Sequence, residues 1–506
     1  MLKNSSLRGA LVFFILSALF GTGCKVTVDN HHRPNIVFIL CDDLGYGEIS
    51  ALNVNPDKGR IETPYIDRLV AEGMTFMDMH AGSSVCTPTR YGLLTGRYAW
   101  RTKLQSGVVQ GHAPCLIDGQ TLTIAEMLKE KGYHTGIVGK WHLNFIYADP
   151  LTGEKLAEKY KYGPPIHSFI KDGPLDHGFD YFYGYHHSRD MQTVCENNSV
   201  IAQKPPITML PGIEAKAINY INDRTEAAQA GTPFFLYVPL SSPHSPVVPA
   251  EEWQNKSGLN EHADFVMQTD HTVGQIVKAI DDAGLRNNTI IVFTSDNGTS
   301  APTSKISELK EMGHYSSWIL RGSKSDIWDG GHRVPFIVRW PASITAHSKC
   351  SELLCFTDFM PTIAEIVEQQ LPDNAAVDGF SYAPIFFGET QKMKRPAVVH
   401  HSFTGKFAIR NGKWKLVLCP GSGGWTKPKD AAAKESGLPD IQLYDMETDI
   451  SEQKNLHSEY PNVIQELLLE LDQIVTRGRS TPGDKLNNDF EDIDIWKGIT
   501  PTDFNN

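Results

Sequence analysis

The chain has 506 residues, of which 41% are hydrophobic and 21% are charged, a composition typical of globular proteins. Its length exceeds the roughly 250–300 residues that one hydrophobic core usually serves, so we expect a large domain and a smaller one. The 59 acidic residues outnumber the 47 basic ones, and the net charge of -12 argues against nucleic-acid binding through a general positive field. An anionic substrate would need locally placed cations.

The first 23 residues have the pattern of a secretory signal. Lys3 and Arg8 precede an apolar stretch of twelve residues and then small residues up to Cys24. Twelve residues are too few to span a bilayer, which takes about 20. Cys24 stands where a bacterial lipoprotein is cleaved and acylated, but Gly21 replaces the usual Leu, so ordinary signal cleavage is the alternative. We predict a signal peptide over 1–23, lipidation at Cys24, and an exported protein anchored to the bacterial cell envelope by lipid alone, in the periplasm or on the outer membrane surface.

Strand and helix patterns then alternate along the chain. The apolar run at 35–40 predicts a strand buried on both faces. Thr63 as a cap, Pro64 at the first helical position and Gly73 as a stop predict the next helix. The later predicted elements are a helix at 124–131, strands at 135–138 and 234–238, a helix at 264–283 and a strand at 289–294. This alternation predicts an α/β fold in which helices sandwich a large, mostly parallel, mixed sheet.

The pattern changes past about residue 390. Short strand-like pieces occur at 397–400, 406–409, 414–418 and 442–444, followed by an amphipathic helix near 463–475. They predict a smaller antiparallel sheet with a terminal helix. We therefore divide the mature chain into an N-terminal α/β domain over 34–388, a C-terminal subdomain over 389–485 and a polar tail over 486–506.

Polar side chains follow two of the predicted strands. Asp42 and Asp43 come after the first strand, and Asp296 and Asn297 after the strand at 289–294. Ligands of such sheets gather beyond the carboxyl ends of the strands, and oxygen ligands suit Ca²⁺ or Mg²⁺ rather than zinc or copper. Each pair alone is more simply a turn or a cap, and Asn297 also begins a glycosylation sequon. Their joint appearance, each next to a glycine, favours a metal site.

The string Cys86-Thr87-Pro88-Thr89-Arg90, followed by Thr95-Gly96-Arg97, is the most specific motif of the chain. Because proline suits the first turn of a helix, we expect Cys86 at a helix N-terminus, where the dipole and free amides favour negative charge. Unmodified, Cys86 could be a low-pKa nucleophile or an inert core thiol. The full string resembles the pattern that type I sulfatases present to the formylglycine-generating enzyme, which oxidises the cysteine to formylglycine (3-oxoalanine).

The resemblance to these sulfatases, arylsulfatase-like members of the alkaline-phosphatase-like superfamily, covers nearly the whole mature chain. It extends to Lys140 and His142 in Gly-Lys-Trp-His, to His244 in Pro-His-Ser-Pro, and to the segments 321–324 and 329–335. Singly, Lys140 is more often a surface lysine and His244 a loop histidine, but their order and neighbours resemble those of the family. Two departures put local packing in doubt: Cys41 stands where the family usually has Ala, and Ser323 and Asp326 lie in a segment often richer in Gly and Thr.

The resemblance implies a sulfuric ester hydrolase whose catalytic domain is the part over 34–388. It implies one Ca²⁺ held by Asp42, Asp43, Asp296, Asn297 and the modified Cys86. The hydrated aldehyde at Cys86 would attack sulfur, with Arg90 favouring its anionic form. The residues implied in binding the sulfate are Lys140, His244 and Lys324, with His244 or Lys324 protonating the departing alcohol. His142 would deprotonate the second hydroxyl of the sulfated hydrate and so expel sulfate.

The expected substrate of an exported sulfatase is a sulfated carbohydrate, such as an algal polysaccharide or a glycosaminoglycan oligosaccharide. Aromatic side chains between 141 and 187 could stack on a sugar ring, but a turn common in the family favours core packing. They are Phe145, Tyr147, Tyr160, Tyr162, Phe179, Tyr181, Tyr183 and Tyr185. One alternative is a phosphonate or phosphodiester hydrolase of the same superfamily. Another is a non-catalytic, surface glycan-binding lipoprotein, against which Cys86, Arg90, His142 and the complete set of oxygen ligands argue.

Six cysteines remain unassigned: Cys41, Cys115, Cys195, Cys350, Cys355 and Cys419. An even number in an exported chain allows disulfides, but the spacing names no partners. Buried free thiols are the alternative.

Overall fold

The fold was obtained as a computed structural model that describes residues 33–53, 61–157, 163–389 and 395–499. The predicted signal peptide with Cys24, and the aromatic residues Tyr160 and Tyr162, lie outside these ranges. None of the helices in the described ranges combines the length and the apolar character that crossing a membrane requires.

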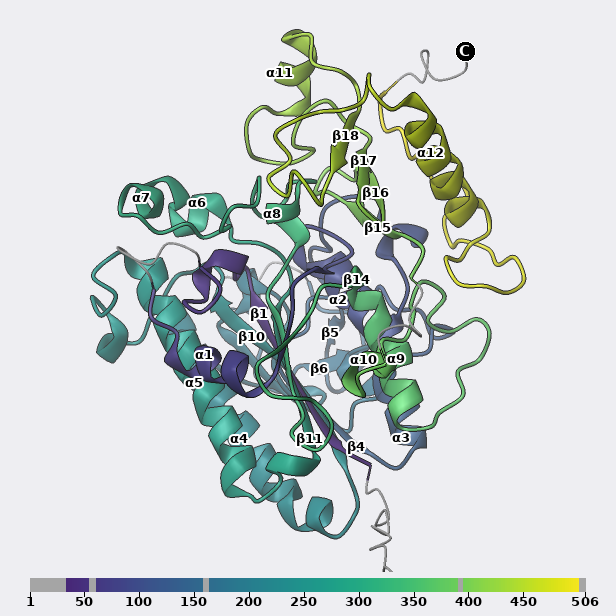
Figure 1. The fold of residues 1–506 in the computed structure, drawn as a ribbon. Helices are drawn as coiled ribbons and strands as arrows, with labels where there is room; N and C mark the ends of the chain where they lie inside the picture. The colour runs from purple at the N-terminus through teal and green to yellow at the C-terminus, as the bar shows by residue number, and fades with distance from the viewer. Residues whose placement is uncertain (1–32, 54–60, 158–162, 390–394, 500–506) are drawn as a thin grey trace, which may run out of the picture. The chain divides into compact units, whose positions relative to one another are not determined.

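A mixed sheet of twelve strands forms the centre of the N-terminal part (Figure 1). Its five middle strands, β11, β1, β10, β4 and β7, run parallel, and antiparallel pairs flank them on both sides. In sheet order the strands are β13 (Ser348–Cys350), β2 (Met74–Phe76), β12 (Phe336–Arg339), β11 (Thr289–Ser295), β1 (Asn35–Asp42), β10 (Phe234–Pro243), β4 (His134–Lys140), β7 (Tyr181–Tyr185), β8 (Thr193–Glu196), β9 (Ser199–Gln203), β6 (Phe169–Lys171) and β5 (Ile146–Ala148). The predicted fold class, α/β with a large mixed sheet, is confirmed.

Helices cover both faces of this sheet (Figure 1). One face packs against α1 (Pro64–Glu72), α4 (Met209–Gln229) and α5 (Glu261–Asp282), and the other against α2 (Cys86–Thr95), α3 (Ile124–Glu130), α9 (Phe359–Ile366) and α10 (Ala383–Phe386). Four short helices are α6 (Ala301–Ser304), α7 (Ile306–Glu311), α8 (Asp329–His332) and α11 (Asp430–Glu435), and a separate pair of strands is β3 (Met79–His80) with β14 (Leu354–Cys355).

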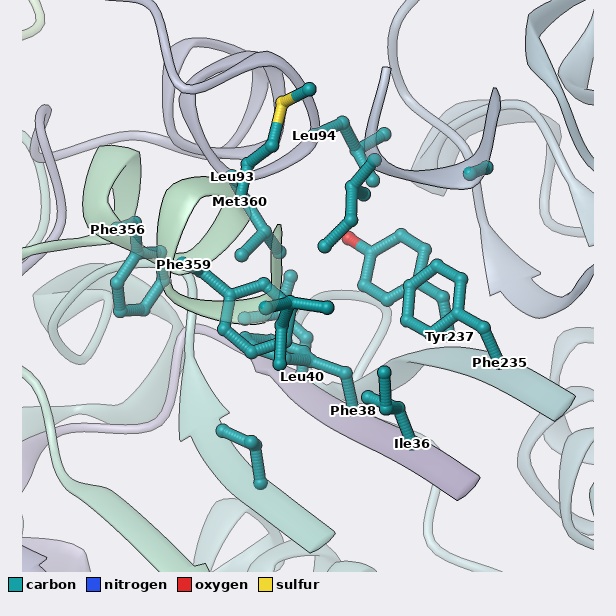
Figure 2. Close-up of a cluster of buried hydrophobic side chains, with 14 of the residues drawn as sticks. Ile36, Phe38, Leu40, Leu93, Leu94, Phe235, Tyr237, Phe356, Phe359 and Met360 are labelled. Carbon is teal, nitrogen blue, oxygen red and sulfur yellow. The ribbon is translucent and has the colours of Figure 1, made fainter. Parts of the chain in front are cut away.

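The side chains of strand β1 show why helices cover both faces of the sheet. Its side chains alternate between the two cores because successive residues of a strand point to opposite faces. Val37 and Ile39 pack with α1, α4 and α5, whereas Phe38 packs on the other side. Figure 2 shows Phe38 together with Tyr237 of β10 and Phe359 of α9, whose ring centroid lies 4.7 Å from that of Phe38. Burying one such side chain contributes about 1.5–3 kcal/mol, which fixes this strand and the polar residues that follow it.

Helix α1 begins and ends where the sequence predicts, but its N-terminus is capped differently. Thr63 makes no side-chain capping bond to the described residues, and its hydroxyl donates to Asp67 instead. The carboxylate of Asp270, on α5, accepts the N–H groups of Tyr65 and Ile66 at 3.2 and 2.7 Å. The expectation of a local threonine cap is therefore wrong, because a neighbouring helix satisfies these donors.

The C-terminal part contains an antiparallel sheet of four strands: β15 (Val398–His401), β16 (Phe407–Asn411), β17 (Trp414–Val417) and β18 (Gln442–Asp445). Helix α12 (Pro461–Thr476) packs on one face through Leu467 and Leu471. The other face packs through Ala408 and Val417 on Trp328, just before α8. The predicted small sheet with a terminal helix is confirmed. In the predicted tail, Asp489 forms an ion pair with Arg97 at 2.8 Å.

The seven cysteines within the described residues are all free and buried. The alternative of buried free thiols therefore describes Cys41, Cys115, Cys195, Cys350, Cys355 and Cys419. Cys41 is fully buried in the hydrophobic core on the face of the sheet that α1, α4 and α5 cover. Asp326 accepts the backbone N–H groups of Ser323, Trp425 and Thr426, and thus ties its loop to the C-terminal part.

Candidate active site

The ends of β1 and β11 bring together the four polar residues that follow them. These strands run parallel and pair in register up to Cys41 and Ser295. The N–H of Asp296 donates to the carbonyl of Cys41 at 3.0 Å, and the N–H of Asp43 donates to Asp296 Oδ1 at 3.3 Å. We call Asp42, Asp43, Asp296 and Asn297 the carboxylate site; all four are fully buried. The parallel strands thus place four oxygen-bearing side chains at one edge of the sheet.

A glycine allows the chain to pass close to this site. A Cβ on Gly298 would lie 1.9 Å from the carbonyl oxygen of Gly330, far inside contact distance. The N–H of Gly298 donates to the carbonyl of Gly331 at 2.9 Å. Only glycine fits this approach, which holds Asn297 against the loop that carries α8.

Cys86 is the first residue of α2, as predicted, and its thiol faces the carboxylate site. Its Sγ lies 3.5 Å from Asp42 Oδ1 and 3.5 Å from Lys324 Nζ. The position before it is Val85, which has no side-chain group to cap the helix, so the first amides of α2 are open to an anion. Burial, and then Asp296, raises the pKa of the Cys86 thiol well above its ordinary value. The geometry therefore disfavours an unmodified low-pKa nucleophile at this position.

Three cations surround the carboxylate site. Lys140 Nζ lies 2.5 Å from Asp42 Oδ2, and Lys324 Nζ bonds Asp43 Oδ1. The guanidinium of Arg90 donates to Asp296 Oδ2 through Nε at 3.1 Å and Nη2 at 2.7 Å, and its Nη1 donates to the carbonyl of Lys140 at 2.9 Å. Each carboxylate thus has a cationic partner, and the three charges of each sign balance.

The carboxylates differ in their ease of ionisation. Burial alone would raise the pKa of Asp42, but Lys140 and then His244 lower it well below its usual range. Burial and the neighbouring Asp42 raise the pKa of Asp296 to about 7, against the opposing effect of Arg90. Part of the rise at Asp296 comes from repulsion by Asp42, which a bound cation would relieve.

Two oxygen atoms of the site point to that cation. Asp43 Oδ2 and Asn297 Oδ1 are buried, and neither has a hydrogen-bond partner among the described residues. An unpartnered buried acceptor costs about 1–3 kcal/mol, a cost that a coordinated hard cation removes. Asp42, Asp43, Cys86 and His244 also place ligand atoms within 4.8 Å of one another. The residues present therefore fit an oxygen-ligated metal ion.

His142 and His244 flank the same site. The carbonyl of His142, a residue with a left-handed φ of 54°, accepts a bond from the Thr87 hydroxyl at 3.1 Å, and its buried Nδ1 has no partner among the described residues. Burial, then Lys140 and Arg90, lowers the pKa of His142 well below its usual range. His244 Nδ1 donates to the carbonyl of Ser245, and its Nε2 lies 3.5 Å from Asp43 Oδ2. All the predicted site residues therefore converge on one place, apart from Cys24, which lies outside the described ranges.

Sequence reasoning missed several neighbours of this site. His112 Nε2 donates to Asp190 Oδ2 at 3.0 Å, and the ring of His187 lies 5.8 Å from that of His142. The sequence feature that could have indicated these neighbours is the pair His186-His187 at the end of the aromatic segment. In that segment Phe145, Tyr147, Phe179, Tyr183 and Tyr185 are at most 5% exposed, which agrees with core packing.

Comparisons with known proteins agree with the resemblance to sulfatases found in the sequence. The family model described as Sulfatase matches residues 34–368, and the one described as N-sulphoglucosamine sulphohydrolase, C-terminal, matches residues 323–421. The N-acetylgalactosamine-6-O-sulfatase of Bacteroides thetaiotaomicron is 32% identical over 506 aligned positions, which cover 90% of this chain and 97% of that protein. Human arylsulfatase A is 31% identical, with 87% of each chain covered.

A solved structure from work on glycosaminoglycan metabolism by Bacteroides thetaiotaomicron superposes with a TM-score of 0.75. It is 29% identical, and the match covers 88% of this chain and 99% of that one. The family match spans well over half of the chain, and the relatives match over nearly their full lengths. The chain therefore belongs to the sulfatase family, within the alkaline-phosphatase-like superfamily, and is a sulfuric ester hydrolase.

Proposed function

We propose that the protein removes sulfate from a sulfated carbohydrate, with formylglycine at position 86 as the nucleophile and Ca²⁺ as the metal. The observation that carries the proposal is the position of Cys86 at the open N-terminus of α2, 3.5 Å from both Asp42 and Lys324. The thiol sulfur there stands in for an oxygen of the hydrated aldehyde. Helix amides and a buried ammonium both favour negative charge on that oxygen.

Asp42, Asp43, Asp296 and Asn297 would hold Ca²⁺, together with an oxygen of residue 86. Four oxygen donors and no sulfur or nitrogen donor among these four favour a hard cation. When bound, Ca²⁺ supplies positive charge that stabilises an anionic nucleophile and the sulfate oxygens.

The three cations of the site would have different roles. Arg90 donates hydrogen bonds to Asp296 and to the Lys140 carbonyl and lies 3.8 Å from Asp42, so it acts as a positioning residue for the metal ligands. Lys140 and Lys324 would bind the sulfate. Burial alone would lower the pKa of Lys324, but Asp43 raises it above its ordinary value, so this lysine keeps its proton. Either Lys324 or His244 would protonate the departing alcohol; burial lowers the pKa of His244, so its ring would have to take up a proton on Nε2 first.

His142 would act as the base in the second half of the reaction. Its neutral ring, with an unpartnered Nδ1, can take the proton from the second hydroxyl of the sulfated hydrate, so that the C–O bond to sulfate breaks and the aldehyde returns. Because the pKa of His142 is lowered, the base stays neutral below its ordinary value of about 6.5. The acid limb of kcat against pH should therefore lie below that value.

The carbohydrate substrate is supported by the relatives. A protein named N-acetylgalactosamine-6-O-sulfatase aligns over 97% of its length, and a structure from glycosaminoglycan work aligns over 99% of its own. We therefore assign a sulfated saccharide, of the glycosaminoglycan or algal polysaccharide class, as the substrate.

The experiment combines peptide mass with a substrate panel. Conversion of the cysteine to the aldehyde lowers the mass of the peptide that contains residue 86 by about 18 Da. Purified protein should show this loss and should desulfate defined oligosaccharides faster than it cleaves phosphate diesters or phosphonate esters. Full activity with an intact thiol would overturn the nucleophile, and a preference for phosphonate or phosphodiester would overturn the reaction. Cys86→Ala supplies the background for both measurements.

We also propose export through residues 1–23 and a lipid anchor at Cys24, with maturation by a formylglycine-generating enzyme. The support is the sequence pattern alone. In a bacterial host, the native protein should partition with membranes and Cys24→Ala should be released into the soluble envelope fraction. Equal partition of the two would leave ordinary signal cleavage as the explanation.

A further inference from the structure

Three buried histidines meet outside the carboxylate site. His80 lies on β3, His332 ends α8 and His400 lies on β15, and each side chain is fully buried. Each offers a ring nitrogen, and these atoms lie within 4.8 Å of one another. We call His80, His332 and His400 the histidine cluster. None of them has a role in the proposed reaction, although His332 belongs to the segment 329–335 that the sequence singles out.

The shortest contacts indicate which ring nitrogens carry protons. His80 Nε2 lies 2.8 Å from Asp78 Oδ1, and His332 Nε2 lies 3.0 Å from the carbonyl oxygen of Ile327. These acceptors lie closer to the two Nε2 atoms than the donors Arg410 Nη1 and Lys415 Nζ, each at 3.3 Å, so the shorter contacts favour protons on both Nε2 atoms. In the neutral rings the two Nδ1 atoms then carry bare lone pairs, yet they lie 3.0 Å apart. Two facing lone pairs repel, so a positive charge belongs between them.

The third ring has no partner for either nitrogen. His400 Nδ1 and Nε2 are both buried without a hydrogen bond to any residue that the structure describes. Its ring stacks on His332 with centroids 4.0 Å apart and lies 4.9 Å from that of His80. Such a residue costs stability unless a further group satisfies it.

The surrounding charges cancel. Asp78 pairs with Arg333 and Arg410, and Lys415 bonds Asp329 and Glu452 at 2.7 Å each. The nearest cations approach the Nε2 edges: Arg410 Nη1 lies 3.3 Å from His80 Nε2, and Lys415 Nζ lies 3.3 Å from His332 Nε2. Burial lowers the pKa of all three histidines, which keeps the rings in the neutral form that binds metals.

We propose that the histidine cluster binds one transition-metal ion of the Zn²⁺ class, at a second metal site distinct from the carboxylate site. Imidazole ligands suit zinc, copper or nickel and not Ca²⁺. The Asp78 carboxylate and the Ile327 carbonyl hold the ligating rings as such partners hold metal-bound histidines elsewhere. Zn–N bonds of about 2.0–2.1 Å put two nitrogens of a tetrahedral site roughly 3.4 Å apart, close to the 3.0 Å between the two Nδ1 atoms. His400, free of hydrogen bonds, rotates to supply the third nitrogen, and a water takes the fourth position.

The ion would tie the C-terminal sheet to the segment that leads into α2. The carbonyl of His332 accepts the N–H of Ala81 at 2.8 Å, and the carbonyl of His401 accepts the N–H of Ser84 at 3.2 Å. Residues 81–84 run directly into Cys86. A metal that joins His80, His332 and His400 would therefore stabilise the segment 81–84 that precedes the nucleophile, without touching the substrate.

The test uses the full mature protein, stripped with a chelator and then kept in excess Ca²⁺ so that the oxygen ligands are filled. Zn²⁺ and, separately, Co²⁺ are titrated in. We expect one further equivalent to bind, a rise in Tm, and a Zn K-edge spectrum with a nitrogen shell and imidazole scattering. No further equivalent, or an oxygen-dominated shell, would overturn the proposal and leave a shared proton between His80 and His332. Ca²⁺ binding and sulfatase turnover are measured separately, so failure here does not count against the proposed function.

His400→Ala should lose this equivalent and the Co²⁺ absorption. The matched control is His401→Ala, because His401 is equally buried and unpartnered but pairs with Phe407 on the opposite face of β15. It should keep the metal. Retention of the metal by His400→Ala would place it elsewhere, for example at His186, His187 and Asp190, and would refute the assignment. Should His400→Ala fail to fold, the spectrum of the wild-type protein decides alone.

Discussion

The carboxylate site and the histidine cluster are both buried groups of balanced charge, but they leave different atoms without partners. In the first, three carboxylates are matched by Arg90, Lys140 and Lys324. The second is surrounded by three carboxylates matched by Arg333, Arg410 and Lys415. The unpartnered atoms are oxygens in the first and ring nitrogens in the second. Ligand chemistry selects the metal, so the two sites are distinguished by the atoms that lack hydrogen-bond partners and not by their charge balance.

The largest effect is expected at the nucleophile. Cys86→Ser keeps a hydroxyl beside Asp42 and Lys324 but cannot form a hydrate, so a sulfated serine has no internal route to expel sulfate. Multiple turnover should fall by a factor on the order of 10⁴ or more, and a sulfated enzyme should accumulate. Intact mass and steady-state kinetics measure both. Near-normal turnover by this variant would remove the chemical reason for an aldehyde.

The second effect concerns stability at the histidine cluster. Asp78→Asn leaves Arg333 and Arg410 buried without the carboxylate that both contact, at 3.2 and 2.7 Å. Breaking a buried ion pair from one side costs about 3–5 kcal/mol, which urea unfolding measures. The control is Asp373→Asn, whose side chain is 64% exposed and pairs with Arg479, and which should cost less than about 1 kcal/mol. Equal losses of unfolding free energy in the two variants would mean that burial does not determine how much an ion pair contributes to stability.

The carboxylate site could be predicted because parallel strands carry their carboxyl ends to one edge. Asp42 and Asp296 each follow an apolar run that predicts a parallel strand, and ligands of such sheets gather beyond the carboxyl ends; the structure adds that the two strands are neighbours. The histidine cluster could not be predicted, because His80, His332 and His400 meet only when the C-terminal sheet packs on Trp328. No local pattern encodes that packing.

The sequence did not predict helix α4 or the short strands beyond β7, and the reasons are local. Pro211 and Gly212 lie within the first turn of α4 and break its apolar period, although the helix runs on for 21 residues. The strands β5, β6, β8 and β9 are three to five residues long and lie within or just after the aromatic segment, where strand and turn signals mix. The cap of α1 by Asp270 depends likewise on a neighbouring helix. Helices, strands and caps that depend on contacts with residues distant in sequence therefore cannot be predicted from local sequence patterns.

The third effect concerns metal affinity and separates the two sites directly. Asp43→Asn removes a charge from the carboxylate site and leaves Lys324 without its partner. Calcium affinity should fall by at least about 100-fold, since changing even the outer partners of metal ligands costs 10–100-fold. Calorimetric titration with Ca²⁺ measures it. Asp78→Asn, where folded, should keep the wild-type affinity for Ca²⁺; a parallel loss there would show that the two sites are not independent.

The smallest effect is a pH dependence of stability. It tests whether His401 on β15 stays unprotonated in the folded protein. Burial, and then Lys497, lowers the pKa of His401 to about 3, while the unfolded chain keeps the ordinary value of about 6.5. Between these values only the unfolded state binds the proton, so stability is complete above about pH 6.5 and is lost as pH falls toward 3. From pH 7 to 5 this single group removes about 2 kcal/mol.

His401→Gln has no such proton to bind, so its free energy of unfolding should fall by about 2 kcal/mol less than that of the wild type over the same interval. Urea unfolding at pH 7 and pH 5 measures the difference, and the other histidines cancel because both proteins contain them. An identical fall in both proteins would mean that His401 is protonated in the folded state and that β15 tolerates charge. Because His400 lies next to it on the opposite face, that result would also weaken the case for neutral rings in the histidine cluster.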